Sequence, residues 1–271
     1  MLPYAPDYGQ YASVYNALSF VMASMGASTI YFFFHAHLVQ HKYRTALCIS
    51  GLVTLIAFYH YMRMFNSWTE AYTFPAVTAT STIYAPVATG APYNDAYRYM
   101  DWLLTVPLLL IELILVMDLD SERTQRVSTQ LGVAAALMIV LGYPGEITMD
   151  HGTRWIFWTL AMIPFCFIVY TLFIGLADAV ERQPADAKSL VSQARYVTII
   201  SWLTYPVVYI LPMLGVEGDS AFVSIQIGYS MSDFISKCVV GLMIVKIAMK
   251  KSQGKRTDGV DGALNDGLMG Q

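Results

Sequence analysis

Two apolar stretches of this sequence carry ionisable side chains at helical spacing. The first runs from Tyr97 to Met117 and contains Asp101, Thr105 and Glu112. On an α-helix Asp101 and Thr105 share one face, and Glu112 returns to within about 20° of that direction, roughly 16 Å along the axis. Carboxylates inside a membrane are costly, so they indicate function by default. A polar network that only holds helices together is the alternative.

The second stretch, IGYSMSDFISKCVVGLMIV, places Asp233 and Lys237 one helical turn apart. A lysine in the middle of such a segment must pair, lose its proton or be chemically modified. If two acids and Arg98 converge on one ammonium, a covalent imine suits the site better than a salt bridge that only holds helices together. Desolvated lysines are the ones that form Schiff bases. A buried salt bridge between Lys237 and Asp233 is the alternative.

The composition places both stretches in an integral membrane protein. Of 271 residues, 56% are hydrophobic and only 13% are charged, against about 25% charged residues in soluble domains. The formal net charge of −3 gives no reason to expect a nucleic acid partner. Cysteines and histidines show no zinc-like spacing, so no metal is expected. No nucleophile–base set or phosphate loop indicates an enzyme.

Seven apolar stretches are long enough to cross about 30 Å of hydrocarbon, which predicts an all-α bundle of seven transmembrane helices. They lie near residues 9–38, 44–66, 95–117, 128–146, 153–176, 191–213 and 221–249. The connection from Ser67 to Asn94 has β-branched residues between turn formers, which predicts a short β-hairpin over one end of the bundle. We expect one domain over 1–250 and a disordered cytoplasmic tail over 251–271.

Lysine and arginine gather in connections that would share one side of the membrane, and behind the last span. They are Lys42, Arg44, Arg123, Arg126, Arg182, Lys188, Arg195, Lys246, Lys250, Lys251, Lys255 and Arg256. The opposite side offers only Arg154, with Arg63 and Arg98 near outer helix ends. The positive-inside rule predicts an N-terminus outside and a C-terminus in the cytoplasm, in a multi-pass protein of the cell (cytoplasmic or inner) membrane. Asp101 then lies in the outer half of its helix and Glu112 in the inner half.

The segments RYMDWLLTVPLLLIE, WLTYPVVY and DFISK resemble the microbial (type 1) rhodopsins, seven-helix proteins with retinal linked to a lysine of the last helix. The resemblance covers nearly the whole chain. The triplet Asp101, Thr105 and Glu112 is similar to that of the proton-pumping proteorhodopsin and xanthorhodopsin branch. FYHYMRMFNSW, NDAYRYMDW and LGYPGEI resemble xanthorhodopsin relatives.

The resemblance implies a role for each residue of the polar centre. Lys237 resembles the lysine that binds all-trans retinal as a protonated Schiff base. Asp101 resembles the primary counterion and proton acceptor, and Asp233 the second counterion. Glu112 matches the carboxylate that returns a proton from the cytoplasmic side. Its apolar surroundings disfavour the charged form, so Glu112 can wait protonated.

The resemblance also implies partners for these carboxylates. Arg98 would lie beneath them, towards the outside, and His60 would hydrogen-bond Asp101. Tyr61 and Tyr205 could donate hydrogen bonds to the second counterion.

A set of further residues falls where this family packs retinal: Trp102, Leu109, Met138, Gly142, Trp158, Phe165, Trp202, Tyr205, Pro206 and Tyr209. Leu109 occupies the position where leucine goes with green absorption. Trp158 stands where members with a keto-carotenoid antenna have glycine. A bulky indole would close the window onto the retinal ring, so a carotenoid antenna is not expected.

Acceptor outside and donor inside together imply a light-driven outward proton pump. The expected partners are protons, the lipid bilayer and copies of the same chain, as a trimer to hexamer. A photosensor signalling through a membrane partner is the alternative, but it has little need for Glu112. A chloride pump should lack the carboxylate of Asp101, and sodium pumps of this family carry Asn and Gln in the triplet. A non-retinal heptahelical receptor or transporter is the remaining reading.

The group that releases the proton to the outside is left open by the sequence. The extracellular glutamate pair of haloarchaeal pumps is not matched, because Ile225 and its neighbours are apolar or neutral. Glu217 and Asp219 are loop acids that offer weak candidates.

Overall fold

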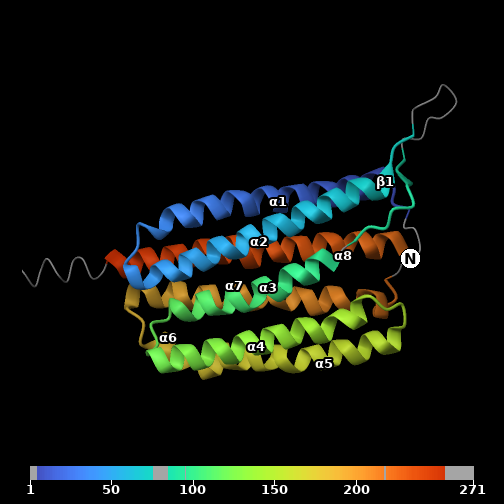
Figure 1. Ribbon diagram of the computed structural model, residues 1–271. Helices are drawn as coiled ribbons and strands as arrows, with labels where there is room; N and C mark the ends of the chain where they lie inside the picture. Colours follow the sequence, from blue (N-terminus) through green and yellow to red (C-terminus); the bar gives the residue numbers. More distant parts are fainter. Residues whose placement is uncertain (1–4, 76–84, 95, 217, 254–271) are drawn as a thin grey trace, which may run out of the picture.

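The protein is a bundle of seven long helical segments that run side by side, as the computed structural model shows for residues 5–75, 85–94, 96–216 and 218–253 (Figure 1). The expected all-α, seven-helix fold is confirmed. The long helices are α1 Tyr8–Ala36, α2 His41–Ala71, α3 Ala96–Leu115, α4 Ser121–Glu146, α5 His151–Tyr170, α7 Ala185–Ile210 and α8 Gly218–Asp233.

Two of these helices continue with altered winding. After α8 the chain forms a π-helical segment, η3 Phe234–Val239, and then stays helical over 240–253. After α5 a second π-helical segment, η1 Thr171–Gly175, leads into the short helix α6 Ala177–Glu181. A short 3₁₀ turn, η2 Leu211–Leu214, ends α7. Wide π turns are frequent at functional sites, and η3 contains Lys237.

Five of the described segments are long and apolar enough to cross a membrane by length and composition: α1, α2, α4, α5 with η1, and α7 with η2. The other two spans are those that carry the polar centre. Helix α3 holds three charged residues, Arg98, Asp101 and Glu112, within 20 residues. Helix α8 is only 16 residues long because the winding changes at Phe234. The candidate chemistry therefore lies in the two spans that differ from the other five by their charge or by an interrupted α-helix.

Two helices begin several residues before the apolar stretches that predict them. Helix α4 begins at Ser121, seven residues before the expected position, because the Asp120 side chain accepts a hydrogen bond of 2.8 Å from the Arg123 amide. Helix α7 begins at Ala185, directly after Pro184. Hydrophobicity alone does not predict where these two helices begin, because their first turns are polar.

A short antiparallel pair joins α2 to α3, as expected for this connection. Strand β1 Tyr72–Thr73 pairs with β2 Val87–Ala88, with Tyr72 opposite Ala88. It extends from the end of α2 at one end of the bundle (Figure 1). Residues 76–84 of the expected hairpin connection and residues 254–271 of the expected tail lie outside the described residues, whereas residues 251–253, the start of the expected disordered tail, are helical.

The helices pack in a closed ring in the order α1, α2, α3, α4, α5, α7, α8, and α8 returns to α1. Large apolar side chains such as Phe34, Ile163 and Ile200 are exposed on the outer surface, as expected for contact with lipid. Asp101, Glu112, Asp233 and Lys237 are buried inside the ring. The polar centre is therefore shielded by the helices that carry it.

At the end that carries most lysines, Asp118 ties three helices together. It follows α3 in a left-handed conformation, with φ of 58°. Its carboxylate lies 2.7 Å from Lys42 Nζ, accepts a 2.7 Å hydrogen bond from Tyr43 and lies 3.5 Å from Lys251 Nζ. Burial alone would raise the pKa of Asp118, but the hydrogen bonds from Lys42 and Tyr43 and the nearby lysine charges lower it. Lys251 also donates to the Val116 carbonyl at 2.6 Å, which caps α3.

Candidate functional site

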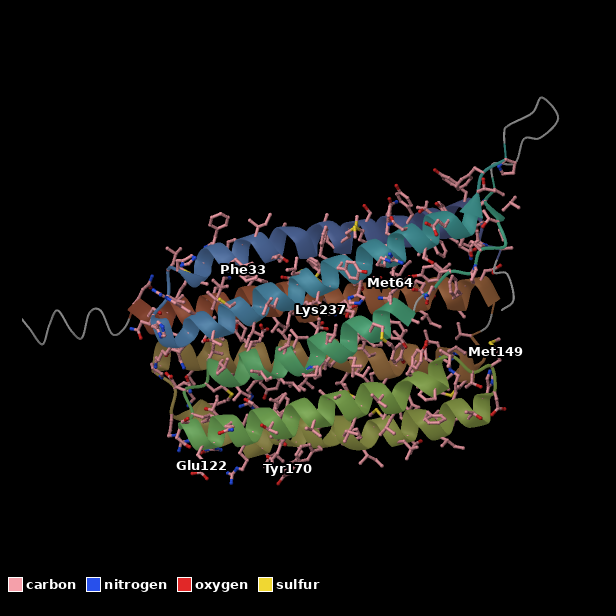
Figure 2. All side chains as sticks on the ribbon, viewed as in Figure 1. Phe33, Met64, Glu122, Met149, Tyr170 and Lys237 are labelled. Carbon is pink, nitrogen blue, oxygen red and sulfur yellow. The ribbon has the colours of Figure 1, made fainter. Side chains whose placement is uncertain are left out.

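The centre of the bundle is an ion pair between one lysine and two aspartates. Lys237 Nζ lies 2.8 Å from Asp101 Oδ2 and 2.7 Å from Asp233 Oδ1. The lysine is only 1% exposed, and both aspartates are fully buried. Figure 2 shows Lys237 about midway along the bundle. The structure therefore brings together α3 and the α8–η3 segment at the point the sequence indicates.

The two carboxylates differ in how completely they are hydrogen-bonded. Asp233 accepts from the Tyr61 and Tyr205 hydroxyls, each at 2.7 Å, and from Trp102 Nε1 at 3.0 Å. The expected contacts of both tyrosines are thus present. In contrast, Asp101 Oδ1 has no hydrogen-bond partner within the described part of the chain. Because hydrogen bonds to a charged carboxylate stabilise the charge, Asp101 is the more readily protonated of the two.

Arg98 completes the cluster one helical turn from Asp101. Its Nη1 donates to the Tyr61 hydroxyl at 2.8 Å and lies 3.6 Å from Asp233 Oδ2. Its Nη2 donates to Gln226 Oε1 at 3.0 Å. Two cations therefore balance two anions, which lowers the cost of burying each charge.

Glu112 lies well apart from this cluster, in a drier part of α3. Eleven residues separate it from Asp101, roughly 16 Å of helix. Its side chain is fully buried. The Ser50 hydroxyl of α2 lies 2.6 Å from Oε2, and Oε1 has no hydrogen-bond partner among the residues described. Such surroundings favour a neutral carboxyl group over a charged one.

Thr105 and His60, two predicted members of the polar centre, hydrogen-bond to backbone carbonyl groups and not to the Asp101 carboxylate. The Thr105 hydroxyl donates to the backbone carbonyl of Asp101 at 2.8 Å. His60 is buried, and its Nδ1 lies 3.0 Å from the Ile56 carbonyl. Since a carbonyl only accepts, this nitrogen carries the proton. The described residues contain no hydrogen bond between His60 and Asp101, so the contact that the resemblance implies is not formed here.

An apolar cavity adjoins the ion pair. Nine of the ten residues expected to pack retinal line it: Trp102, Met138, Gly142, Trp158, Phe165, Trp202, Tyr205, Pro206 and Tyr209. The tenth, Leu109, is buried but is not among the lining residues. Further lining residues escaped the sequence reasoning: Tyr99, Val106, Ile139, Ala161, Met162 and Tyr229. Several lie three or four residues from an expected one, a helical spacing that could have revealed them.

The cavity fits an elongated apolar group attached to Lys237. Trp102 and Tyr205 line it and also bond Asp233, the carboxylate that pairs with the lysine. One wall of the cavity is therefore formed by residues that also bond the carboxylate partner of Lys237. A Cβ added at Gly142 would only reach ordinary contact with its neighbours, 3.8 Å from the Ala161 Cβ, so this glycine leaves space in the cavity rather than avoiding a clash.

A closed ring of seven membrane helices around a buried lysine and its two carboxylates defines the class of protein. The chain belongs to the bacteriorhodopsin-like protein family, whose model matches residues 14–251. Members of this family bind retinal covalently through a lysine.

Similar proteins cover nearly the whole chain. Green-light absorbing proteorhodopsin from Gamma-proteobacterium EBAC31A08 is 33% identical over 244 residues, which are 89% of this chain and 89% of that protein. The structure of xanthorhodopsin, described as a light-driven ion pump with dual chromophore, is 40% identical with a TM-score of 0.87, covering 93% of this chain and 98% of that one. The structure of thermophilic rhodopsin is also 40% identical, with the same TM-score, covering 94% and 99%. The chain is thus a microbial rhodopsin of the proteorhodopsin/xanthorhodopsin branch.

Proposed function

We propose that the protein is a light-driven outward proton pump that carries all-trans retinal on Lys237 Nζ as a protonated Schiff base. The observation that carries the proposal is the spacing of two buried acids along α3, one beside the lysine and one far towards the inner end. When bound, retinal supplies light absorption and a change of shape that alters the surroundings of Nζ. The remaining steps follow from the side chains of this chain.

Asp101 is the acceptor in this proposal. It lies 2.8 Å from Lys237 Nζ, which is within direct reach for a proton. Its second oxygen lacks a hydrogen-bond partner among the described residues, whereas Asp233 has three donors besides the lysine. The proton therefore moves to Asp101, and Asp233 remains the anion that balances Arg98.

Glu112 returns the proton in this proposal. Among the described hydrogen-bonding groups, only Ser50 contacts this buried carboxyl group. The site therefore favours the protonated form over the charged one. Because Glu112 lies roughly 16 Å of helix from Asp101, acceptor and donor serve opposite sides of the lysine. The positive-inside orientation places the donor towards the cytoplasm, so net transport runs outward.

The other properties of the pigment follow from the same pocket. Leu109 supports green absorption, by the resemblance to proteorhodopsin. Trp158 supports the absence of a carotenoid antenna, because its Nε1 donates to the Pro206 carbonyl at 3.1 Å and its indole forms part of the cavity wall. We further propose that the protein works in the cell membrane, as a homo-oligomer from trimer to hexamer.

Illumination of cells that express the pigment tests the proposal. The cells are suspended in unbuffered salt, and the external pH is recorded with and without a protonophore. We expect acidification in the light that the protonophore abolishes. A normal pigment that gives no pH change would overturn the pump and favour a photosensor that signals through a membrane partner.

A further inference from the structure

Glu146 is a mostly buried acid at the outer end of the bundle, at the last residue of α4. Its side chain is 12% exposed. The other acids described at this end have different surroundings: Asp7 and Asp150 are exposed helix caps, Glu70 is exposed, and Asp219 accepts from the Ala5 amide at 3.0 Å. Glu217 lies outside the described residues.

Two tyrosines connect Glu146 to the pocket around the lysine. The hydroxyls of Tyr99 and Tyr229 each lie 3.5 Å from Glu146 Oε2. Both rings pack against Trp102, with centroids 4.9 and 5.1 Å away, and Tyr229 also lies under the Arg98 guanidinium. Glu146 therefore sits directly outside the aromatic wall of the site.

A cavity with polar and apolar walls reaches from Glu146 to Gln226, a hydrogen-bond partner of the arginine of the centre. It is lined by Glu146, Arg154, Tyr99 and Gln226, and Gln226 accepts from Arg98 Nη2 at 3.0 Å. Its volume is about 350 Å³, far above the ~15 Å³ that one water molecule needs. The cavity is thus large enough to hold hydrogen-bonded water between Glu146 and Gln226, which contacts Arg98.

Arg154 sets the charge on Glu146. Its Nη2 lies 3.3 Å from Glu146 Oε2, and its guanidinium also donates to the backbone carbonyls of Glu146 and Tyr209, each at 3.1 Å, and lies over the Tyr209 ring. The guanidinium therefore favours a carboxylate at rest, which can accept a proton. Because the carbonyls hold Arg154 in place, its charge also disfavours the protonated state and speeds onward release.

We propose that Glu146 is the outer relay that receives the proton leaving Asp101 and passes it to the external medium. The O–H bond of protonated Asp101 breaks and restores its carboxylate. The proton bonds to a carboxylate oxygen of Glu146, then leaves to water at the outer surface and restores that carboxylate. This inference rests on the proposed outward pump and names the release group that the pump requires.

Time-resolved proton release tests this role in the retinal-loaded protein. Glu146→Gln keeps the size of the side chain and one acceptor oxygen but cannot carry the proton. A pH-indicating dye reports release, while transient absorption reports the pigment cycle. We expect release in E146Q to be slowed by roughly 10²-fold, the scale of a lost acid–base group, with an unchanged resting spectrum. Asp150→Asn, which removes an exposed acid at the same end, should release with wild-type timing.

Infrared spectra of the wild-type protein provide a second measurement that does not depend on the variant folding. A transient band of a protonated carboxyl group should follow the loss of the Asp101 band and shift in Glu146→Asp. Unchanged release in E146Q, or no such band, overturns the relay. If wild-type vesicles pump outward while E146Q is unaffected, only the relay fails. If the wild type does not pump outward, the proposed function itself fails.

Discussion

The hydrogen bond between Ser50 and Glu112 allows a detailed prediction about the donor. The Ser50 hydroxyl lies 2.6 Å from Glu112 Oε2 and 3.2 Å from the Ala46 carbonyl oxygen. A hydroxyl has one hydrogen, and a carbonyl oxygen only accepts. Both contacts can form at once only if Glu112 is protonated and donates to Ser50, which then donates to Ala46. The geometry therefore suits a donor that waits with its proton bound.

Replacing Ser50 by alanine should make Glu112 give up its proton more readily. The substitution removes the acceptor of the Glu112 proton and leaves the neutral carboxyl group without its described partner. A hydrogen bond of this kind contributes about 1 kcal/mol, which corresponds to about a fivefold shift of the transfer equilibrium. We expect Lys237 to regain its proton up to about fivefold faster in S50A.

Transient absorption of the pigment measures the rate at which Lys237 regains its proton. Glu112→Gln should slow this step by roughly 10²-fold or more, because the donor is lost. The double variant should match E112Q alone, since Ser50 acts through Glu112. A slower return in S50A would show that Ser50 stabilises the carboxylate instead. An effect of S50A that persists in the E112Q background would show that it acts by another route.

Three further outcomes are expected. Asp101→Asn should abolish light-driven acidification and remove the red shift of the visible band that protonation of Asp101 produces at low pH; an unchanged titration would refute the counterion assignment. Because the pKa of Asp118 is lowered in the folded protein, its contribution to stability is present above its ordinary pKa and is lost as the pH falls through the folded value; thermal bleaching should show this loss in the wild type and not in D118N. Gly145→Ala should lower stability by about 1–3 kcal/mol because a Cβ would collide with the Tyr209 hydroxyl; Gly132→Ala, whose Cβ would only reach ordinary contact with Pro107 at 3.9 Å, should have little effect on thermal bleaching, and equal effects would contradict the packing argument.

Much of the fold follows from the sequence because the largest free-energy cost, that of backbone groups without hydrogen bonds in the bilayer, is avoided within each segment. A stretch of about 20 apolar residues can hide its backbone only as a helix in the bilayer, so the spans are visible without any knowledge of their neighbours. The same holds for Asp233 and Lys237, whose spacing on one helix brings them together. Polar helix starts such as Ser121 are missed because they depend on a cap and not on hydrophobicity.

The rest of the site depends on relations between helices. Nothing in the sequence around Glu112 indicates that Ser50 faces it, because this contact is set by the packing of α2 against α3. Glu146 belongs to a motif that the sequence singles out, but its partners come from α3, α5 and α8. The wide turn at Phe234–Val239 is invisible to a reading that assumes a uniform helical period.

The closed ring of helices constrains how this chain could be rearranged. Helix α1 packs against α8, yet the described chain begins at one end of the bundle and finishes at the other (Figure 1). A circular permutant would have to connect these ends along the full length of the bundle. Through the bilayer, such a connection must satisfy its own backbone and needs about 20 apolar residues in a helix. Permutation is therefore expected to succeed only when the linker is itself an eighth membrane-crossing helix, packed outside the ring.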